Sequence, residues 1–274
     1  MRDAMERVKT KEILDVQCDL CHGMNFSKLH EWPVGDFWNP ASIPLSVYQC
    51  MCCELVFLHP VPSPEQLPGG GDWWKQRPEY RRMRWWKKFW EPTRYALFGT
   101  PHTRMIKATS RICPGGSLLD IGCGTGELLD VAKKYYECHG LEPSPVAAEV
   151  ARQKIGGEIV ESTLENATFS KLFDIVTLFS VIEHVTSPTA ALSKVYSFIK
   201  PGGIVVLQTP KYGGPACKLH GRGWKGFRHG YHTFLFSGKT LSALMEKTGF
   251  DVLSFPKRDR PLDDILILWG RKKE

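Results

Sequence analysis

The feature that most constrains the fold of this chain is a run of three alternating glycines at positions 122, 124 and 126. A short apolar run, Ser117 to Ile121, comes before them and is typical of a buried strand in a parallel sheet. A stretch with helical spacing, Glu127 to Tyr136, comes after them. Its apolar face would consist of Leu128, Leu129, Ala132 and Tyr135. A strand, a glycine turn and a helix in this order predict the start of a nucleotide-binding βαβ unit, because glycine allows positive φ and close approach of a ligand.

Two acidic residues near this turn help to predict which nucleotide it would bind. Asp120 lies two residues before the first glycine, and Glu142 follows a short second strand, Cys138 to Leu141. An acid at the end of the second strand can accept hydrogen bonds from ribose hydroxyls. The glycines are spaced G-x-G-x-G, whereas the dinucleotide fingerprint is G-x-G-x-x-G. The alternative is an ordinary Rossmann turn that binds NAD or no ligand.

This stretch resembles the S-adenosylmethionine (SAM) site of the class I methyltransferases. In that family the acid before the glycines and the turn backbone hold the methionine end of the cofactor, and the strand-two acid holds the ribose. The matching positions are Asp120, Gly122, Cys123, Gly124, Gly126 and Glu142. The resemblance also places Leu164, between Thr163 and Glu165, along the adenine. It places Phe179 and Ser180 beside the sulfonium.

The rest of the C-terminal half fits an α/β, Rossmann-like class I methyltransferase fold with a seven-stranded sheet. Further strands are expected at 158–160, 173–179 and 204–209, and helices within 143–156, 190–199 and 238–249. The turn Lys200 to Gly203 would separate a helix from the fifth strand. In the resembling family, the last two strands, 250–255 and 265–269 here, form the antiparallel end of the sheet.

Four cysteines near the N-terminus have the spacing of a metal site. Cys18 and Cys21 form one C-x-x-C pair, and Cys50 and Cys53 form a second about thirty residues later. Two such pairs are typical of a structural zinc site in which four thiolates complete a tetrahedron. Iron in the same four-cysteine site and buried cysteines that bind no metal are the alternatives. Cys52 competes with Cys53 as a ligand, and His22 and His30 are further alternative ligands. The second pair and its proline-rich exit resemble a bacterial methyltransferase group that has an N-terminal zinc module and includes deoxysugar C-methyltransferases.

These patterns divide the chain into three parts. Residues 1–70 would form the zinc-binding module, beginning with a helix or tail at 1–16. Residues 71–111 are rich in tryptophan, lysine and arginine, and would form an amphipathic helix or linker, a lid over the site, or a surface for nucleic acid or membrane. In the lid reading, Tyr80 and Tyr95 would contact the substrate or cofactor. Residues 112–274 would form the methyltransferase domain, with a loop-like substrate insertion at 210–236.

Two histidines are candidates for the general base. His184 follows Glu183 just beyond the fourth strand, where ligands of open α/β sheets bind. His232 lies in the insertion, where the resembling C-methyltransferases have a Tyr-His-Glu-His run. Here the run reads His229-Gly230-Tyr231-His232, so Tyr231 replaces the glutamate and is a third catalytic candidate. Hydrogen-bonded structural histidines are the alternative at both positions.

Composition restricts the remaining choices. No apolar run is long enough to span a bilayer, and the mixed-charge N-terminus does not resemble a signal peptide, which predicts a cytoplasmic protein. The expected acceptor is a small molecule, such as a sugar, a nucleotide-linked sugar or a related metabolite. The net charge of +7 would favour an acceptor that carries an anionic group, but it does not single out nucleotide-linked sugars. The alternatives are an RNA methyltransferase and a cofactor-binding protein without turnover. No Asn/Asp-Pro-Pro-Tyr-type motif of base methylation follows the fourth strand, and the oligomeric state is left open.

Overall fold

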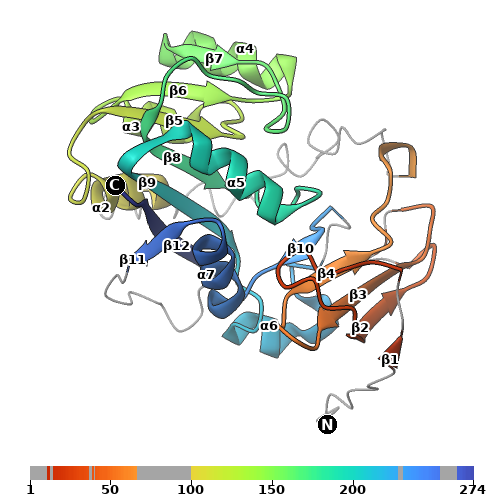
Figure 1. Cartoon of the computed structure of the whole chain (residues 1–274). Helices are drawn as coiled ribbons and strands as arrows, with labels where there is room; N and C mark the ends of the chain where they lie inside the picture. The colour runs from red at the N-terminus through yellow and green to blue at the C-terminus, as the bar shows by residue number, and fades with distance from the viewer. Residues whose placement is uncertain are drawn as a thin grey trace.

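The computed structural model describes residues 11–12, 15–36, 39, 41–66, 100–227, 231–253 and 264–274. These residues form two sheets (Figure 1). The aromatic and basic stretch expected to form a linker or lid, with Tyr80 and Tyr95, lies outside the described residues except for its last part. That part is helix α2, Pro101–Thr109.

The larger sheet has seven strands in the order β11-β12-β9-β8-β5-β6-β7. Five neighbouring strands, β9 to β7, run parallel, and β12 is antiparallel to both β9 and β11. The sequence-based expectation of a seven-stranded sheet with an antiparallel end is therefore confirmed. The bounds are β5 Ser117–Ile121, β6 Glu137–Leu141, β7 Glu158–Val160, β8 Phe173–Phe179, β9 Ile199–Pro210, β11 Phe250–Leu253 and β12 Ile265–Lys272.

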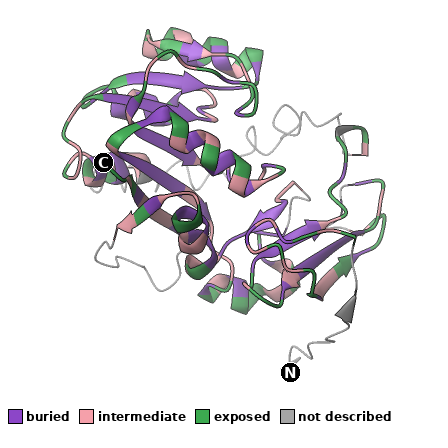
Figure 2. Cartoon of the chain, in the orientation of Figure 1, coloured by how far each residue is buried: buried purple, intermediate pink, exposed green. Residues whose placement is uncertain are grey.

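Helices cover both faces of this sheet and form a separate core on each. On one face α2 packs with α3 (Glu127–Ala132) and α4 (Pro145–Ile155) around Leu118, Ile175 and Val206. On the other face α5 (Pro188–Phe198) and α7 (Gly238–Lys247) pack around Leu119 and Val176. The central strands are buried along most of their length (Figure 2), as expected for a parallel sheet covered on both faces.

The smaller sheet has the order β1-β2-β3-β4-β10 and is antiparallel throughout. Its bounds are β1 Lys11–Glu12, β2 Phe26–Trp32, β3 Leu45–Cys50, β4 Val56–His59 and β10 Phe234–Leu235. The edge strand β10 comes from the insertion and pairs with β4 beside the orange strands in Figure 1. The N-terminal sheet is thus completed by residues nearly two hundred positions further along the chain.

Four local expectations were wrong. Helix α3 ends at Ala132, so Tyr135 lies beyond it and is 37% exposed. Residues 200–203 belong to β9 as an irregular segment, because the pairing shifts from Phe173–Ile199 to Ile175–Ile204. The insertion is not a plain loop: it contains α6 (Pro215–His220), a 3₁₀ turn (Gly221–Gly223) and β10. The N-terminal segment contains the short strand β1 rather than a helix where it is described.

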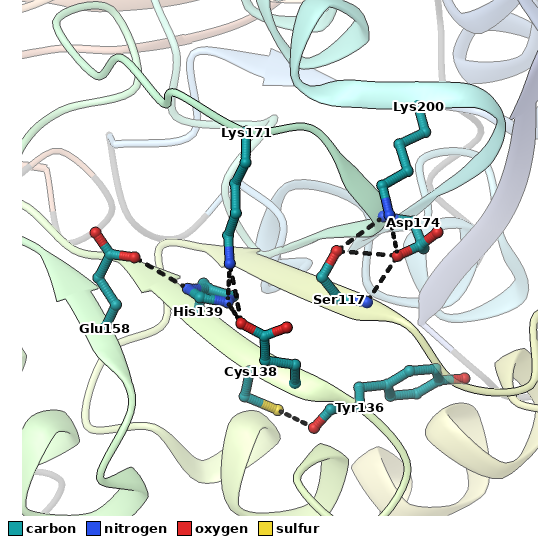
Figure 3. Close-up of polar contacts among 9 residues, drawn as sticks. Ser117, Tyr136, Cys138, His139, Glu158, Lys171, Asp174 and Lys200 are labelled. Atoms are coloured by element: carbon teal, nitrogen blue, oxygen red, sulfur yellow. Dashed lines mark hydrogen bonds and ion pairs between the residues drawn. The ribbon is translucent and has the colours of Figure 1, made fainter.

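Polar contacts tie the strands together near their amino ends, away from the glycine turn (Figure 3). The Asp174 carboxylate accepts from the Ser117 amide at 2.7 Å and from the Lys200 ammonium at 2.8 Å. The buried His139 ring lies between Glu137 and Glu158, with Lys171 also in contact. These contacts link residues of strands β5 to β9 with Lys171, which lies just before β8. None of the described helices combines the length and apolar character needed to cross a membrane.

Candidate functional site

The glycine turn joins β5 to α3 and has the backbone geometry that the sequence predicts. Gly122, Gly124 and Gly126 have φ values of 71°, 54° and 79°, a region that favours glycine. A Cβ atom on Gly122 would lie 2.6 Å from Val181 Cγ2, so the turn packs tightly against the loop after β8. Cys123 is buried beneath the turn, and burial raises the pKa of its thiol. The thiol is therefore a packing group at neutral pH.

Glu142 bridges the two loops at the carboxyl end of β5 and β6. One carboxylate oxygen accepts from the Gly124 amide at 2.9 Å, and the other accepts from the Ser144 amide at 3.0 Å. Glu142 is buried, and Ser144 caps α4 by accepting from Ala147. The glycine turn and the acid named for ribose binding are thus in direct contact.

Asp120 lies at the end of β5 and is buried. Its carboxylate accepts from the Thr177 hydroxyl at 2.6 Å. Burial raises the pKa of Asp120 to about 7, with a further rise from the nearby Glu142 charge, while the Thr177 hydrogen bond acts against the rise. A carboxyl with this pKa gains or loses its proton near neutrality, so a cation placed beside it would drive the loss. Sequence reasoning did not identify Thr177, because a threonine inside an apolar strand has no distinctive signal.

The other predicted cofactor positions lie at the end of β8, which is next to β5, and after β7. Phe179 ends β8, and its ring lies 6.0 Å from the ring of His102 on α2. Ser180 follows at φ 52°, in the left-handed region that strains a non-glycine residue, and its amide donates to Gln208 at 2.9 Å. Leu164 is buried in the core beyond β7. His102 was missed because its helix follows the aromatic and basic stretch; burial lowers the pKa of its imidazole.

The two base candidates lie together at the carboxyl end of β8. The rings of His184 and His232 have centroids 4.8 Å apart. His184 Nδ1 donates to the carbonyl of Tyr231 at 2.9 Å, and His232 Nδ1 donates to the carbonyl of Gly226 at 2.9 Å. The backbone carbonyl of Tyr231 thus orients the His184 ring. The buried carboxylate of Glu183 lies beside the histidines, and burial raises its pKa to about 7.

The four N-terminal cysteines also converge. Their Sγ atoms all lie within 4.8 Å of one another, with Cys18 and Cys53 3.4 Å apart and Cys21 and Cys50 3.5 Å apart. Sulfurs around tetrahedral zinc, with Zn–S bonds of about 2.3 Å, are about 3.8 Å apart. The donor set and spacing therefore fit a four-thiolate metal ion.

The backbone around each cysteine pair repeats the same turn. The amide of His22 donates to the carbonyl of Cys18 at 2.8 Å, and the amide of Glu54 donates to the carbonyl of Cys50 at 2.9 Å. His22 and Glu54 each follow the second cysteine of a pair and have φ values of 60° and 70°. The two cysteine pairs thus lie on matching turns, and these turns bring their four sulfurs together.

The cysteine turns dock directly on the larger sheet's helices. The Asp19 carboxylate accepts from the Thr189 amide at 2.8 Å and from the Ser187 hydroxyl at 2.5 Å, at the start of α5. The Lys247 ammonium at the end of α7 donates to the carbonyl of Leu20 at 2.7 Å. The loop from Glu183 to Ser187 leads directly into α5, so the cysteine cluster supports the segment that carries His184.

Comparison with known proteins agrees with this geometry. A β5–α3 glycine turn bridged to a strand-two acid defines a nucleotide-binding α/β protein. Residues 91–255 match the model of the methyltransferase domain family, and the chain belongs to that family.

Two curated relatives are ubiquinone biosynthesis O-methyltransferases. The protein from Alkalilimnicola ehrlichii is 34% identical over 103 residues, 35% of this chain and 42% of the relative. The mitochondrial protein from Schizosaccharomyces pombe is 34% identical over 104 residues, 35% of this chain and 38% of the relative. The chain thus spans less than half the length of these relatives.

Solved structures share the fold. A SAM-dependent methyltransferase from Thermotoga maritima has a TM-score of 0.50 and 25% identity, and the match covers 67% of this chain and 95% of that one. The N-methyltransferase NodS from Bradyrhizobium japonicum, in complex with S-adenosylhomocysteine (SAH), has a TM-score of 0.50 and 16% identity, covering 66% and 92%. The second likeness concerns the fold alone.

Proposed function

We propose that this protein transfers the methyl group of SAM to a small-molecule acceptor. The observation that carries the proposal is the Glu142 bridge, in which one buried acid joins the glycine turn to the next loop at the carboxyl edge of the sheet. Asp120 would face the methionine end of SAM, and Glu142 the ribose. Leu164, Phe179 and Ser180 would complete the cofactor site. Membership of the methyltransferase domain family supports this assignment.

The acceptor would carry a hydroxyl group, as in a sugar, a nucleotide-linked sugar or a related metabolite. In the reaction the acceptor oxygen attacks the sulfonium methyl, the S–CH3 bond breaks, and its electron pair stays on sulfur to give SAH. The hydroxyl loses one proton, and His184 and His232 are the groups placed to promote this loss. Most of the rate enhancement would come from aligning oxygen, methyl carbon and sulfur. Two relatives named as O-methyltransferases support an oxygen acceptor.

We also propose that Cys18, Cys21, Cys50 and Cys53 hold a structural zinc ion. With four protein thiolates as ligands, the ion would have no open position for a substrate. It would fix the two cysteine turns and, through Asp19, the start of α5.

Calorimetric titration with SAH tests the cofactor site. Glu142→Ala should weaken SAH binding about 10- to 100-fold, because a charge-assisted hydrogen bond contributes about 1.5–3 kcal/mol. Glu161→Ala is the matched control: Glu161 is an exposed acid just beyond the neighbouring strand β7 and should leave SAH affinity unchanged. If folded wild-type protein does not bind SAH, the proposed function is wrong. SAH release from SAM in the presence of hydroxylated acceptors would then distinguish an enzyme from a cofactor-binding protein.

A further inference from the structure

A carboxylate without hydrogen bonds is buried beside the two histidines. Glu183 is 0% exposed, and neither of its carboxylate oxygens makes a hydrogen bond among the described residues. The buried hydroxyl of Thr209 and the hydroxyl of Ser180 lie near this carboxylate, but neither makes a hydrogen bond with it. Burying a carboxylate costs free energy unless a cation or a hydrogen-bond donor compensates its charge. The buried carboxylate of Glu183 therefore needs an explanation.

Hydrogen bonds hold both imidazoles in the Nδ1–H tautomer, which leaves Nε2 as the atom that can bind a metal ion. A carbonyl oxygen can only accept, so the Nδ1 atoms of His184 and His232 carry the hydrogens that they donate to Tyr231 and Gly226. In the neutral imidazole the Nε2 atom then carries the lone pair. Metal-binding histidines usually donate their second ring N–H to a carboxylate, a backbone carbonyl or water, and a backbone carbonyl accepts it from both histidines here.

The backbone holds the three side chains together. The amide of Thr233 donates to the carbonyl of Glu183 at 2.8 Å, and the Thr233 hydroxyl donates to the same carbonyl at 3.0 Å. These bonds fix the loop after β8 against the segment that carries His232. As a result one ligand atom from each of Glu183, His184 and His232 lies within 4.8 Å of the other two.

We propose that Glu183, His184 and His232 form a binding site for a divalent transition-metal ion. One carboxylate and two imidazoles suit zinc, iron or cobalt, and three protein ligands leave positions open for water or substrate. The site differs from the cysteine cluster, whose four sulfurs leave no position open. It lies just beyond the carboxyl end of β8, on the same sheet edge as the glycine turn.

The role of the ion rests on the proposed function. A metal-bound hydroxyl of the acceptor would lose its proton to water more readily, because the ion stabilises the alkoxide that attacks the methyl group. The histidines would then act as ligands rather than as the base. Metal binding itself depends only on the three side chains and can be measured without SAM or an acceptor.

Cobalt titration of the full chain tests the site. The cysteine cluster is first filled with one equivalent of Zn²⁺, and Co²⁺ is then added and followed by visible absorption and calorimetry. We expect one further equivalent of Co²⁺, with ligand-field bands of nitrogen and oxygen coordination and no thiolate-to-cobalt charge transfer. Glu183→Gln and His232→Ala should each weaken this binding by more than about tenfold, because even loss of an outer-shell partner costs 10- to 100-fold. His220→Ala, an exposed histidine in α6, should bind Co²⁺ as the wild type does.

Absence of a second equivalent in the wild type would overturn the proposal. So would Glu183→Gln and His232→Ala variants that bind Co²⁺ as tightly as the wild type. Thermal unfolding of each variant checks that it is folded. SAH titration of the same samples separates the two proposals: SAH binding without the second metal overturns only the metal site, and Co²⁺ binding without SAH binding overturns only the proposed function.

Discussion

At the scale of single residues, the buried Asp120 carboxyl couples cofactor binding to pH. Its pKa of about 7 means that about half of the free protein carries this proton at neutral pH. The ammonium group of SAM or SAH, placed beside it as proposed, would favour the charged carboxylate and expel the proton. SAH should therefore bind about tenfold more tightly at pH 8 than at pH 6, because one proton is released on binding.

Calorimetry in two buffers of different ionisation enthalpy would measure this proton release directly. Asp120→Asn, which cannot ionise, should bind weakly and without pH dependence over this range. A wild-type affinity that is the same at pH 6 and pH 8 would refute the coupling. The stability of the free protein should show the opposite trend: the folded state holds this proton more tightly than the unfolded chain, so the contribution of Asp120 falls as pH rises from about 4 through 7.

The tight contact beneath Gly122 gives a second prediction at this scale. Gly122→Ala would place a Cβ atom 2.6 Å from Val181 and would hold alanine at positive φ. It should lower the free energy of unfolding by about 1–3 kcal/mol and reduce SAH affinity, because the turn must shift. Gly124→Ala is the matched comparison, since it also has positive φ but no atom within 4 Å of the added Cβ. Equal losses of stability in the two variants in urea unfolding would show that the packing against Val181 is unimportant.

At the scale of elements, the start of α5 depends on a side chain from the cysteine turn. Ser187 caps the helix locally by accepting from the Ala190 amide, and Asp19 accepts from the preceding amide, that of Thr189. Asp19→Ala should lower the free energy of unfolding by about 0.5–2 kcal/mol, as loss of a helix cap does. Asp15→Ala, an exposed acid just before the first cysteine pair, should change it little. If both variants have the same urea midpoint of unfolding as the wild type, the contact between Asp19 and Thr189 is not stabilising.

Elements whose signal is local could be predicted from the sequence, and those that depend on distant partners could not. The glycine turn and the strands β5, β7 and β8 have their predicted bounds, because glycine chemistry and short apolar runs act within a few residues. The two-residue strand β10 has no periodicity of its own and exists through its pairing with β4. The His184–His232 contact likewise depends on hydrogen bonds between Thr233 and Glu183, fifty positions apart, so the sequence predicted both histidines but not their contact.

At the scale of the whole molecule, the two sheets share one core. Phe26, Tyr48 and Phe57 of the smaller sheet belong to the same buried cluster as residues of α5 and α7. The covalent path also crosses between the sheets, because β10 lies between β9 and α7 in the sequence and pairs with β4. The N-terminal module therefore cannot lose its structure without exposing apolar surface on the larger sheet's helices.

This shared core predicts a single cooperative unfolding transition in urea. Tryptophan fluorescence and far-ultraviolet circular dichroism should give the same midpoint, because burying a common core couples the two sheets. Removing the proposed zinc ion with a chelator should shift this one transition to lower urea, since an ion bound only by the folded state stabilises the whole unit. A chelator-induced early transition, with the larger sheet unfolding later at its original midpoint, would instead mean that the two sheets fold independently. In that case the contacts of Asp19 and Lys247 would hold the two sheets together without coupling their unfolding. The cysteine cluster would then stabilise only its own turns and not the segment that carries His184.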